Sequence, residues 1–153
     1  MLLTVFLVSC IGNNQNKVTR SDVIAYMDEY FEIVKENDFK LVESFYSETF
    51  YQSTSKEKWE KMFYKVHSVI GTLISVNLQS WNMRSVLSTS GSGKTYTFIY
   101  KNKYENGEVT ETINLFIPRG TKDIGIVGHN FNSDAFLNSP GVDTDGLMTI
   151  DII

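Results

Sequence analysis

Residues 95–118, with the sequence TYTFIYKNKYENGEVTETINLFIP, decide the fold class expected for this chain. Apolar and polar residues alternate on both sides of Asn106-Gly107, which is typical of two β-strands with one buried face each. Asn-Gly is favoured in two-residue turns between antiparallel strands. The segment therefore predicts a β-hairpin in which Glu105 pairs with Glu108. The inward-facing pairs are then Tyr104 with Val109, Tyr100 with Ile113, Phe98 with Leu115 and Tyr96 with Ile117.

Two further strands are predicted beside this hairpin. Ile74, Val76 and Leu78 alternate with polar residues, as in a strand with one solvated face. Residues 118–120 (Pro-Arg-Gly) are expected to break the sheet, and residues 124–131 predict a last strand. The C-terminal half of the chain is thus expected to form an antiparallel sheet of about four strands.

Three amphipathic helices are predicted before the sheet. The first begins at a capping signal, Thr19 with Asp22, and the second begins at Asp38. The third begins at Thr54, which has a glutamate at capping-box spacing, and ends at Gly71. Apolar residues three or four apart mark the buried face of each helix. These are Val23, Tyr26, Met27, Tyr30 and Val34, then Leu41, Val42, Phe45 and Tyr46, then Trp59, Met62, Phe63, Val66 and Ile70.

This order of elements predicts an α+β fold with three N-terminal helices packed on a curved antiparallel sheet. We expect one domain over residues 19–137, because no repeat or low-complexity segment divides it. Residues 138–153 contain a proline, several glycine and aspartate residues and an apolar end. They are expected to form an edge strand or a mobile tail.

The N-terminus carries the pattern of an export signal. Residues 1–9 contain an apolar run that is shorter than the roughly 20 residues of a membrane span but near the length of a signal-peptide core. Leu7-Val8-Ser9-Cys10 resembles the lipobox of bacterial lipoproteins, although no lysine or arginine precedes the run. The resemblance implies lipidation of Cys10, a polar tether over residues 10–18, and a cell-envelope domain facing the periplasm or exterior. The alternative is an N-terminal strand or core helix with a buried free cysteine.

The composition excludes several classes of function. The 153 residues carry a net charge of −4, which argues against nucleic acid as a partner, since such binding depends on neutralising phosphates. The single cysteine excludes a disulfide framework and a cysteine-rich metal site. We therefore expect no metal site and no cofactor.

Three motifs have ordinary explanations. The segment GSGKT at residues 91–95 lacks the first glycine of a phosphate-binding loop and precedes a strand, so a flexible hairpin connection is expected. The acidic residues between 143 and 151 do not have the ligand spacing of a calcium loop. His67 and His129 have no metal-ligand partner at a recognisable spacing. Each is expected to be hydrogen-bonded at the edge of the core, with His129 on the strand face of Val127 and Phe131.

The order of elements also resembles the cystatin-like and nuclear transport factor 2-like superfold, in particular small bacterial lipoproteins built on it. The resemblance rests on the helix ending at Ile70-Gly71, the strand after it, the hairpin between Tyr96 and Ile117, and the run IVGHNFNS at residues 126–133. It implies that the helices and the curved sheet enclose a conical pocket lined by aromatic side chains, or that these rings fill the space as a core. The candidate pocket residues are Tyr26, Tyr30, Trp59, Phe63, Tyr96, Phe98, Tyr100 and His129.

Three functions are compatible with these features of the sequence. The sequence favours a non-catalytic domain, anchored to the membrane through lipidated Cys10, that binds an envelope protein or a small apolar ligand, because no catalytic motif is found. The alternative is an enzyme similar to ketosteroid isomerases, which the superfold also hosts and which would need a carboxylate base and a tyrosine donor. A structural role in an envelope assembly is a third possibility. The carboxylates considered are Glu32, Glu43 and Glu111, with Tyr30 or Tyr100, and spacing selects none of them.

Overall fold

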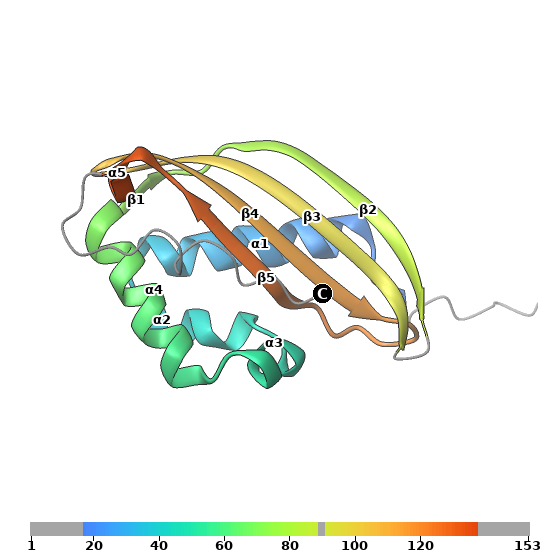
Figure 1. Cartoon of the computed structure of the whole chain (residues 1–153). Helices are drawn as coiled ribbons and strands as arrows, with labels where there is room; N and C mark the ends of the chain where they lie inside the picture. The colour runs from blue at the N-terminus through green and yellow to red at the C-terminus, as the bar shows by residue number, and fades with distance from the viewer. Residues whose placement is uncertain (1–16, 89–90, 138–153) are drawn as a thin grey trace, which may run out of the picture.

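Helices occupy the first part of the described chain and strands follow them (Figure 1). The computed structural model describes residues 17–88 and 91–137. The predicted α+β class is confirmed. The helical elements are α1 (Arg20–Lys35), α2 (Phe39–Val42), the 3₁₀ helix η1 (Glu43–Phe45), α3 (Glu48–Ser53), α4 (Lys56–Ile70) and α5 (Asp134–Leu137). The strands are β1 (Leu73–Ser75), β2 (Leu78–Ser88), β3 (Gly91–Tyr104), β4 (Gly107–Pro118) and β5 (Gly125–Asn132).

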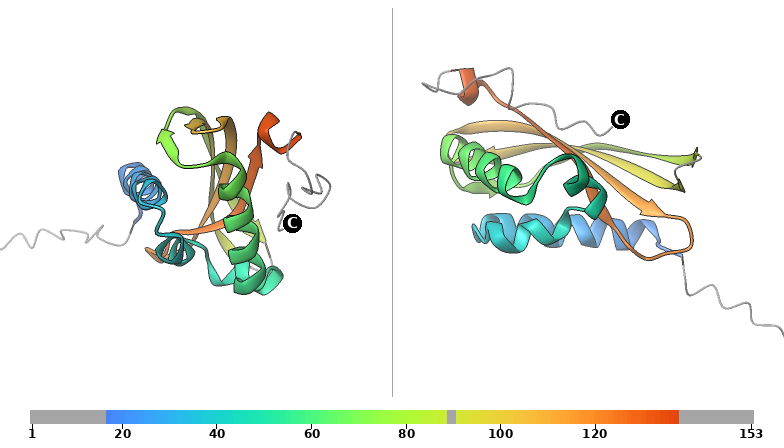
Figure 2. Two further views of the ribbon diagram at one scale, coloured as in Figure 1. Left: turned by 90° about the vertical axis from the view of Figure 1, so that its left-hand side faces the viewer. Right: turned by 60° about the horizontal axis from the view of Figure 1, so that its bottom comes forward.

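The strands form one antiparallel sheet that curls into a half-barrel (Figure 1). β4 pairs with β3 on one side and with β5 on the other. The remaining edge of β3 is shared, because β1 pairs with its C-terminal end and β2 with the rest. This sharing explains why there are five strands where about four were predicted. The sheet arches over α1 to α4, which lie on its concave side (Figure 2).

α1 forms as its sequence pattern predicts. The backbone N–H of Asp22 donates to the hydroxyl of Thr19 at 3.3 Å, and the N–H of Thr19 donates to the Asp22 carboxylate at 2.7 Å. This capping box satisfies backbone donors that the start of a helix leaves open. The ring of Phe31 lies 4.6 Å from that of Tyr100 on β3, so the buried face of α1 packs against the concave side of the sheet. The buried residues of α1 are Val23, Met27, Tyr30, Phe31 and Val34.

The region between α1 and α4 differs from the prediction. The expected second helix consists of two short pieces, α2 and η1, and Leu41 of its expected buried face is exposed. α3 was not predicted, and Ser47 caps it. The cap of α4 is Ser55, whose hydroxyl accepts from the N–H of Lys58, and not Thr54. Several neighbouring serine and threonine residues can cap a helix, and a sequence does not choose among them.

The predicted register of the β3–β4 hairpin is wrong by two residues. Phe98 pairs with Ile113, where Leu115 had been predicted. The turn begins one residue earlier than predicted and comprises Glu105 and Asn106. A shift of two residues leaves each side chain on its predicted face, because the faces of a strand alternate with period two. The observed pairs are Lys103 with Glu108, Tyr104 with Gly107, Tyr100 with Glu111, Phe98 with Ile113 and Tyr96 with Leu115.

Contacts with the end of α4 position this turn. The backbone N–H of Asn106 donates to the carbonyl of Ile70 at 3.0 Å, and its side-chain amide donates to the carbonyl of Val69 at 2.8 Å. The carboxylate of Glu105 accepts from the N–H of Thr72 at 2.8 Å. The two bonds donated by Asn106 satisfy carbonyls that the C-terminus of a helix leaves open, and the bond to Glu105 satisfies the N–H of Thr72 just after the helix. An isolated hairpin does not have this stabilisation, so the local turn signal alone gave the wrong register.

The strand predicted through residues 74–78 is interrupted between β1 and β2. Leu73 is buried and Ile74 is 54% exposed, so the inward face is not the predicted one. At the interruption the N–H of Asn77 donates to the side-chain carbonyl of Asn102 at 3.0 Å. A buried polar side chain of β3 thus takes the place of a backbone partner at this point.

Residues 91–95 belong to β3 and do not form a flexible hairpin connection. A Cβ atom at Gly93 would lie 2.3 Å from the carbonyl oxygen of Ile117 and 2.8 Å from the ring of Phe116. Gly93 is therefore required for the close approach of β3 and β4. The second glycine of the segment GSGKT is thus explained by the packing of the two strands.

A β-bulge in β5 changes which residues face the core. The ladder between β4 and β5 shifts by one residue at Val127. As a result Ile126, and not Val127, is buried on the face of His129. The predicted sharing of a face by His129 and Phe131 is confirmed, since both are buried and their rings stack at 4.0 Å. The predicted sharing of that face by Val127 is wrong, because one inserted residue reverses the alternation.

Aromatic rings fill the space between α4 and the sheet. The ring of Trp59 stacks on that of Phe63 at 4.9 Å, and Phe63 lies 4.4 Å from the ring of His67. At the other end of the half-barrel, the tips of β2 and β3 extend beyond the helices (Figure 1, right). We call this region the open end.

Candidate functional site

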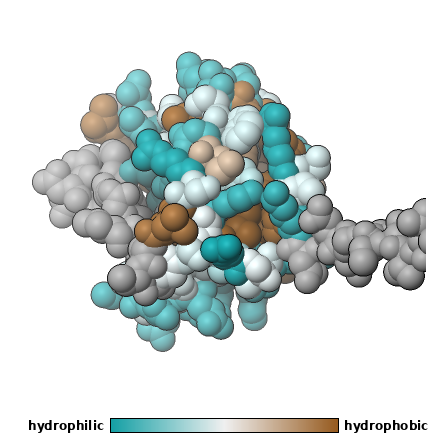
Figure 3. All heavy atoms as spheres, turned by 90° about the vertical axis from the view of Figure 1, so that its right-hand side faces the viewer, coloured by the Kyte–Doolittle hydropathy of each residue, from teal (hydrophilic) through white to brown (hydrophobic). Residues whose placement is uncertain are grey.

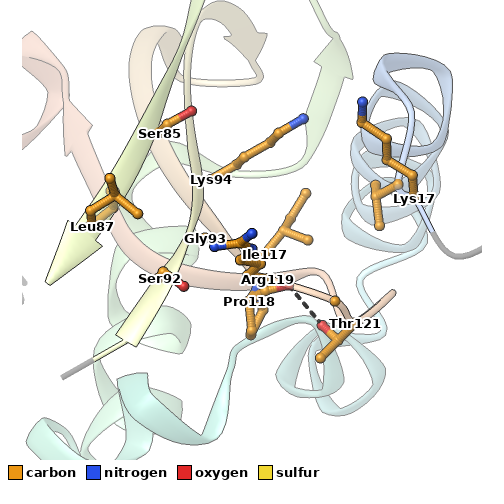
Figure 4. A pocket seen from close by; sticks show the side chains of 13 residues that line it. Lys17, Ser85, Leu87, Ser92, Gly93, Lys94, Ile117, Pro118, Arg119 and Thr121 are labelled. Atoms are coloured by element: carbon orange, nitrogen blue, oxygen red, sulfur yellow. Dashed lines mark hydrogen bonds between the residues drawn. The ribbon is translucent and has the colours of Figure 1, made fainter. Parts of the chain in front are cut away.

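A cavity of about 340 Å³ lies at the open end, between the tips of β2 and β3, the end of β4 and the start of α1 (Figure 4). We call it the open-end cavity. Its size falls at the lower end of the range for small-molecule sites, roughly 300–1,000 Å³. Its apolar lining residues are Val18, Val86, Leu87, Ile117 and Pro118.

The alternation of side chains along the strands determines which residues form the inner wall of the open-end cavity. Lys94 of β3 pairs with Ser85 of β2 and with Ile117 of β4, so these three side chains share the concave face. Tyr96, the next inward residue of β3, is buried, whereas Lys94 is only partly buried. The border between the packed core and the cavity therefore lies between Lys94 and Tyr96.

The loop after β4 closes one side of the cavity. The backbone N–H of Arg119 donates to the carbonyl of Ser92 at 2.8 Å. The hydroxyl of Thr121 donates to the carbonyl of Pro118 at 3.2 Å (dashed line in Figure 4). These bonds hold the loop against β3, so this wall is formed in advance of any binding.

Three of the lining side chains are cationic and none is acidic. Lys94 stands on the inner wall, while Lys17 and Arg119 are exposed at the rim. Among residues 17–88 and 91–137, none of the three forms an ion pair. Figure 4 shows the side chains of Lys17 and Lys94 extending toward the same space. The cavity is thus a local basic site on a chain whose net charge is −4.

Large apolar side chains continue from the cavity along the concave face of β2. Trp81, Met83 and Leu87 are 36%, 43% and 82% exposed. The guanidinium of Arg20 on α1 lies 4.4 Å from the centre of the Trp81 ring. Figure 3 looks onto the open end, where hydrophobic residues (brown) lie between hydrophilic ones (teal). Exposed apolar patches with polar rims mark interaction sites.

A polar network is buried between the sheet and the helices. One oxygen of Glu111 accepts hydrogen bonds from the hydroxyl of Tyr104 at 2.6 Å and the side-chain amide of Asn102 at 2.9 Å. Its other oxygen lies 2.9 Å from Nε2 of His129, whose Nδ1 lies 2.7 Å from the hydroxyl of Tyr46. We call the following residues the buried network: Tyr30, Tyr46, Asn102, Tyr104, Glu111 and His129.

The buried network favours the ionised form of Glu111. Burial raises the pKa of Glu111, but hydrogen bonds and the charge of His129 outweigh burial and hold that pKa below its ordinary value. Burial raises the pKa values of Tyr30, Tyr46 and Tyr104 well above the ordinary tyrosine value, so their hydroxyls stay protonated. The network therefore consists of one carboxylate with protonated donors arranged around it.

A substrate does not reach this network in the observed packing. Each of its members is at most 6% exposed, and none lines the open-end cavity. Both oxygens of Glu111 have partners. The geometry fits a role in the fold, and chemistry on a bound molecule would require the surrounding side chains to move.

His67 differs from the expectation of a hydrogen-bonded histidine. It is buried on α4, and within the described part of the chain neither ring nitrogen has a hydrogen-bond partner. Its ring lies 4.6 Å from that of Phe39 and 4.4 Å from that of Phe63. Burial lowers the pKa of His67 to about 4. The residue therefore packs as a neutral aromatic ring at pH 7.

The eight predicted pocket residues lie together between the helices and the sheet, but they do not line the open-end cavity. All except Tyr26 are buried, and the hydroxyl of Tyr26 donates to the carbonyl of Phe45 at 2.8 Å. The other seven group as follows: Tyr30 and His129 belong to the buried network, Trp59 stacks on Phe63, and Tyr96, Phe98 and Tyr100 stack along β3.

Of the three carboxylates considered for catalysis, Glu111 alone lies in the core. Glu32 pairs with Lys35 at 2.5 Å, and Glu43 pairs with Lys56 at 2.6 Å. These two carboxylates are at least partly exposed and engaged with lysines. The structure thus brings Glu111 together with Tyr30 and His129, and leaves the other two outside the core.

Sequence reasoning missed Asn102 and Tyr104 of the buried network and the three cations of the cavity. A signal was present for Asn102, Glu111 and Lys94. Each is a polar residue at an inward-facing position of a strand whose other inward positions are mostly apolar or aromatic. A polar residue at such a position indicates a buried hydrogen-bond partner or a ligand.

Cys10, most of the predicted tether and residues 138–153 lie outside the described residues. In the part of the chain that is described, no helix is long and apolar enough to cross a membrane. The same residues contain no group of three or more His, Cys, Asp or Glu side chains that could hold a metal ion.

Comparison of the chain with models of protein families, with curated proteins and with solved structures finds no match.

Proposed function

We propose that this protein is a non-catalytic, lipid-anchored domain of the cell envelope that binds a small apolar ligand in its open-end cavity. The fold proposed for it is the cystatin-like or nuclear transport factor 2-like one, in which a curved sheet shelters a ligand site. One observation carries the proposal: a cavity of about 340 Å³ with apolar walls at the place where the packed core ends.

The exposed face of β2 supports this reading. Trp81, Met83 and Leu87 leave apolar surface in water, and covering such surface contributes roughly 25 cal/mol per Å². A ligand seated in the cavity would cover Leu87, which is 82% exposed. A small ligand is preferred to a partner protein as the occupant because the apolar surface here is hollowed.

The position of Lys17 links the cavity to the proposed anchor. Lys17 lines the rim of the cavity and follows Cys10 by seven residues. Seven extended residues span at most about 25 Å. A lipid on Cys10 would thus hold the mouth of the cavity close to the membrane surface, where apolar ligands are concentrated.

The binding proposal is tested with the neutral fluorescent probe Nile red. We expect the wild-type protein to bind the probe with a blue shift, and Ser85→Trp, which fills the cavity from its inner wall, to weaken binding roughly tenfold. The matched control is Ser80→Trp, the same change at an exposed position on the opposite face of β2. Equal binding by both variants and the wild type would refute the cavity as the site.

The anchor is tested separately by cell fractionation. Full-length protein is expected in the membrane fraction, and Cys10→Ala is expected to leave that fraction, because a stable anchor requires the acyl chains on this sulfur. Unchanged membrane association of the Cys10→Ala variant would remove the lipidation proposal, while leaving the cavity proposal to the Nile red experiment.

An isomerase-like enzyme is the second candidate, and one observation favours it. The hydroxyl of Tyr104 lies 2.6 Å from the carboxylate of Glu111, as in a buried acid–base pair. The test is proton exchange at the carbon next to the carbonyl of a steroid ketone, followed by NMR. Exchange that Glu111→Gln abolishes, without unfolding the protein, would support the enzyme over the binding domain.

A further inference from the structure

We infer that the open-end cavity binds an anionic amphiphile, a molecule with one apolar chain and a carboxylate or phosphate head. The inference rests on the proposed function and adds the class of ligand to it. It draws on the charges of Lys17, Lys94 and Arg119, on the apolar walls, and on the absence of any acidic residue among the cavity-lining residues of the described chain.

Lys94 carries most of the argument. It occupies an inward-facing position of β3, in the series that continues with buried Tyr96 and Phe98. A partly buried ammonium loses part of its hydration and is stabilised by a neighbouring anion. The described residues provide no such anion, since Lys94 forms no ion pair and pairs across the sheet with Ser85 and Ile117. A bound head group would supply it.

Lys17 and Arg119 place a second and a third positive charge at the rim. The backbone of Arg119 is fixed by its bond to Ser92, so its guanidinium extends from an ordered loop. A guanidinium can form two parallel hydrogen bonds with a carboxylate or a phosphate. Three cations around one mouth repel one another in the empty site, and an anionic head relieves this repulsion.

The apolar part of the ligand has a path along β2 away from Lys17, Lys94 and Arg119, and the guanidinium of Arg20 lies over the ring of Trp81 at the far end of this path. Leu87 and Ile117 form the inner wall, and Met83 and Trp81 continue the same face of β2 outside the cavity. The head would lie among the cations and the chain along this apolar face. A cationic or a neutral amphiphile would match the apolar face but would supply no negative charge to the three cations.

The experiment compares three probes that share one apolar chain: decanoate, decanol and decyltrimethylammonium. Calorimetric titration of the full-length protein at low ionic strength is expected to give decanoate roughly tenfold tighter binding than decanol, with decyltrimethylammonium weakest. Decyl phosphate, as a fourth arm, distinguishes a phosphate head from a carboxylate head. Added salt is expected to weaken decanoate binding and to leave decanol binding unchanged.

Variants of Lys94 test the charge directly. Lys94→Gln is expected to remove the preference for decanoate over decanol, and Lys94→Glu to reverse it in favour of decyltrimethylammonium. The control is Lys103→Gln, the same change at an exposed, outward-facing position of β3, which is expected to keep the wild-type preference. Thermal unfolding of each variant without ligand verifies that it is folded.

The possible results separate the two proposals. Equal binding of decanoate and decanol, with Ser85→Trp weakening both, would overturn the inferred ligand class and retain the proposed apolar site. Binding of none of the probes, or binding that Ser85→Trp does not change, would overturn the proposed function as well. A preference for decanoate that Lys94→Gln and Lys103→Gln both retain would place the anion elsewhere and refute the inference.

Discussion

Glu111 is a carboxylate buried at 1% exposure, and its partners determine whether it stabilises the fold. Moving a charge out of water costs several kcal/mol, and only good hydrogen bonds and an opposite charge offset that cost. Tyr104, Asn102 and His129 provide these interactions at 2.6–2.9 Å. Removal of Glu111 alone therefore leaves His129, Tyr104 and Asn102 without a partner, whereas removal of Glu111 together with His129 avoids a buried unpaired histidine.

A double-mutant cycle tests this coupling. Glu111→Leu is expected to lower the free energy of unfolding by about 3–5 kcal/mol, because it leaves His129 buried without its partner. The double variant Glu111→Leu/His129→Leu is expected to lose less than the sum of the single changes. Urea unfolding at pH 7 measures each value. Glu108→Leu, an exposed change on the same strand, is the control, and additive single effects would contradict the coupling.

His67 gives a prediction on pH dependence. Burial lowers its pKa to about 4 in the folded protein, against 6.5 as the ordinary value. The unfolded chain therefore takes up the proton first, and folding stability should fall as the pH drops from about 6.5 to about 4, by about 3 kcal/mol from this residue. His67→Phe removes this loss and the two unpartnered nitrogens.

Urea unfolding at pH 7 and pH 4.5 checks this prediction. We expect His67→Phe to be at least as stable as the wild type at pH 7, because its surroundings are aromatic, and to lose less stability on acidification. The difference between the two proteins isolates His67 from the other groups that titrate. Parallel pH curves for the two proteins would show that His67 is not the buried neutral group described here.

At the level of elements, the end of α4 and the β3–β4 turn form one unit. Asn106 and Glu105 of the turn bond to Ile70 and Thr72 around the C-terminus of the helix. Gly71 lies between them with a φ of 80°, a left-handed conformation that favours glycine. A Cβ atom at Gly71 would lie 2.8 Å from the Cβ of Glu105. The close contact between the helix end and the turn therefore also requires a residue without a side chain at this position.

Two glycine substitutions distinguish the loss of stability caused by backbone strain from the loss caused by disturbing the contact between the helix end and the turn. Gly120 has a φ of 82°, and nothing lies within 4 Å of the place where its Cβ would be. We expect Gly120→Ala to lower stability by about 1–2 kcal/mol, from strain alone, and Gly71→Ala by about 1–3 kcal/mol more. Thermal and urea unfolding give both values. Equal losses would show that the contact between helix end and turn adds nothing.

The two ends of the half-barrel have different physical characters. One end holds the aromatic core and the buried network under the helices. The open end holds exposed apolar side chains, three cations and a cavity. β2 belongs to the open end and is an edge strand, because it pairs with β3 alone. Rigid packing and access for a ligand are thus divided along the length of the sheet.

Hydrogen exchange followed by mass spectrometry tests this division. The slowest backbone amides are expected in β4, which is paired on both sides, and the fastest in the tip of β2, since exposed backbone hydrogen bonds open most readily. Decanoate is expected to slow exchange at residues 85–87 and 92–94 and to leave β1 unchanged. Uniform protection of the whole sheet by decanoate would contradict a site confined to the open end.

Local patterns predicted the class of the fold and the faces of β3 and β4. The alternation around Phe98 and Ile113 places both side chains inward in any register that differs by two residues. The capping box of Thr19 was also predictable, because its two residues are three apart in sequence. Ser55, by contrast, caps α4 in place of Thr54, since neighbouring polar residues compete for one role.

The sequence by itself determined which side chains face inward in α1, α4, β3 and β4, because the period of a regular strand or helix depends only on neighbours along the chain. It did not do so in β1, or beside the bulge of β5, where the regular period is interrupted. The tertiary structure alone decided which inward residues meet. The docking of Asn106 on α4 set the register that brings Glu111 opposite Tyr100, and the pairing of β4 with β5 brings His129 within 2.9 Å of the Glu111 carboxylate. The open-end cavity likewise combines residues from segments that are far apart in the sequence, namely 17–18, 85–94 and 117–121. A local sequence pattern gives no information on the distance between such segments.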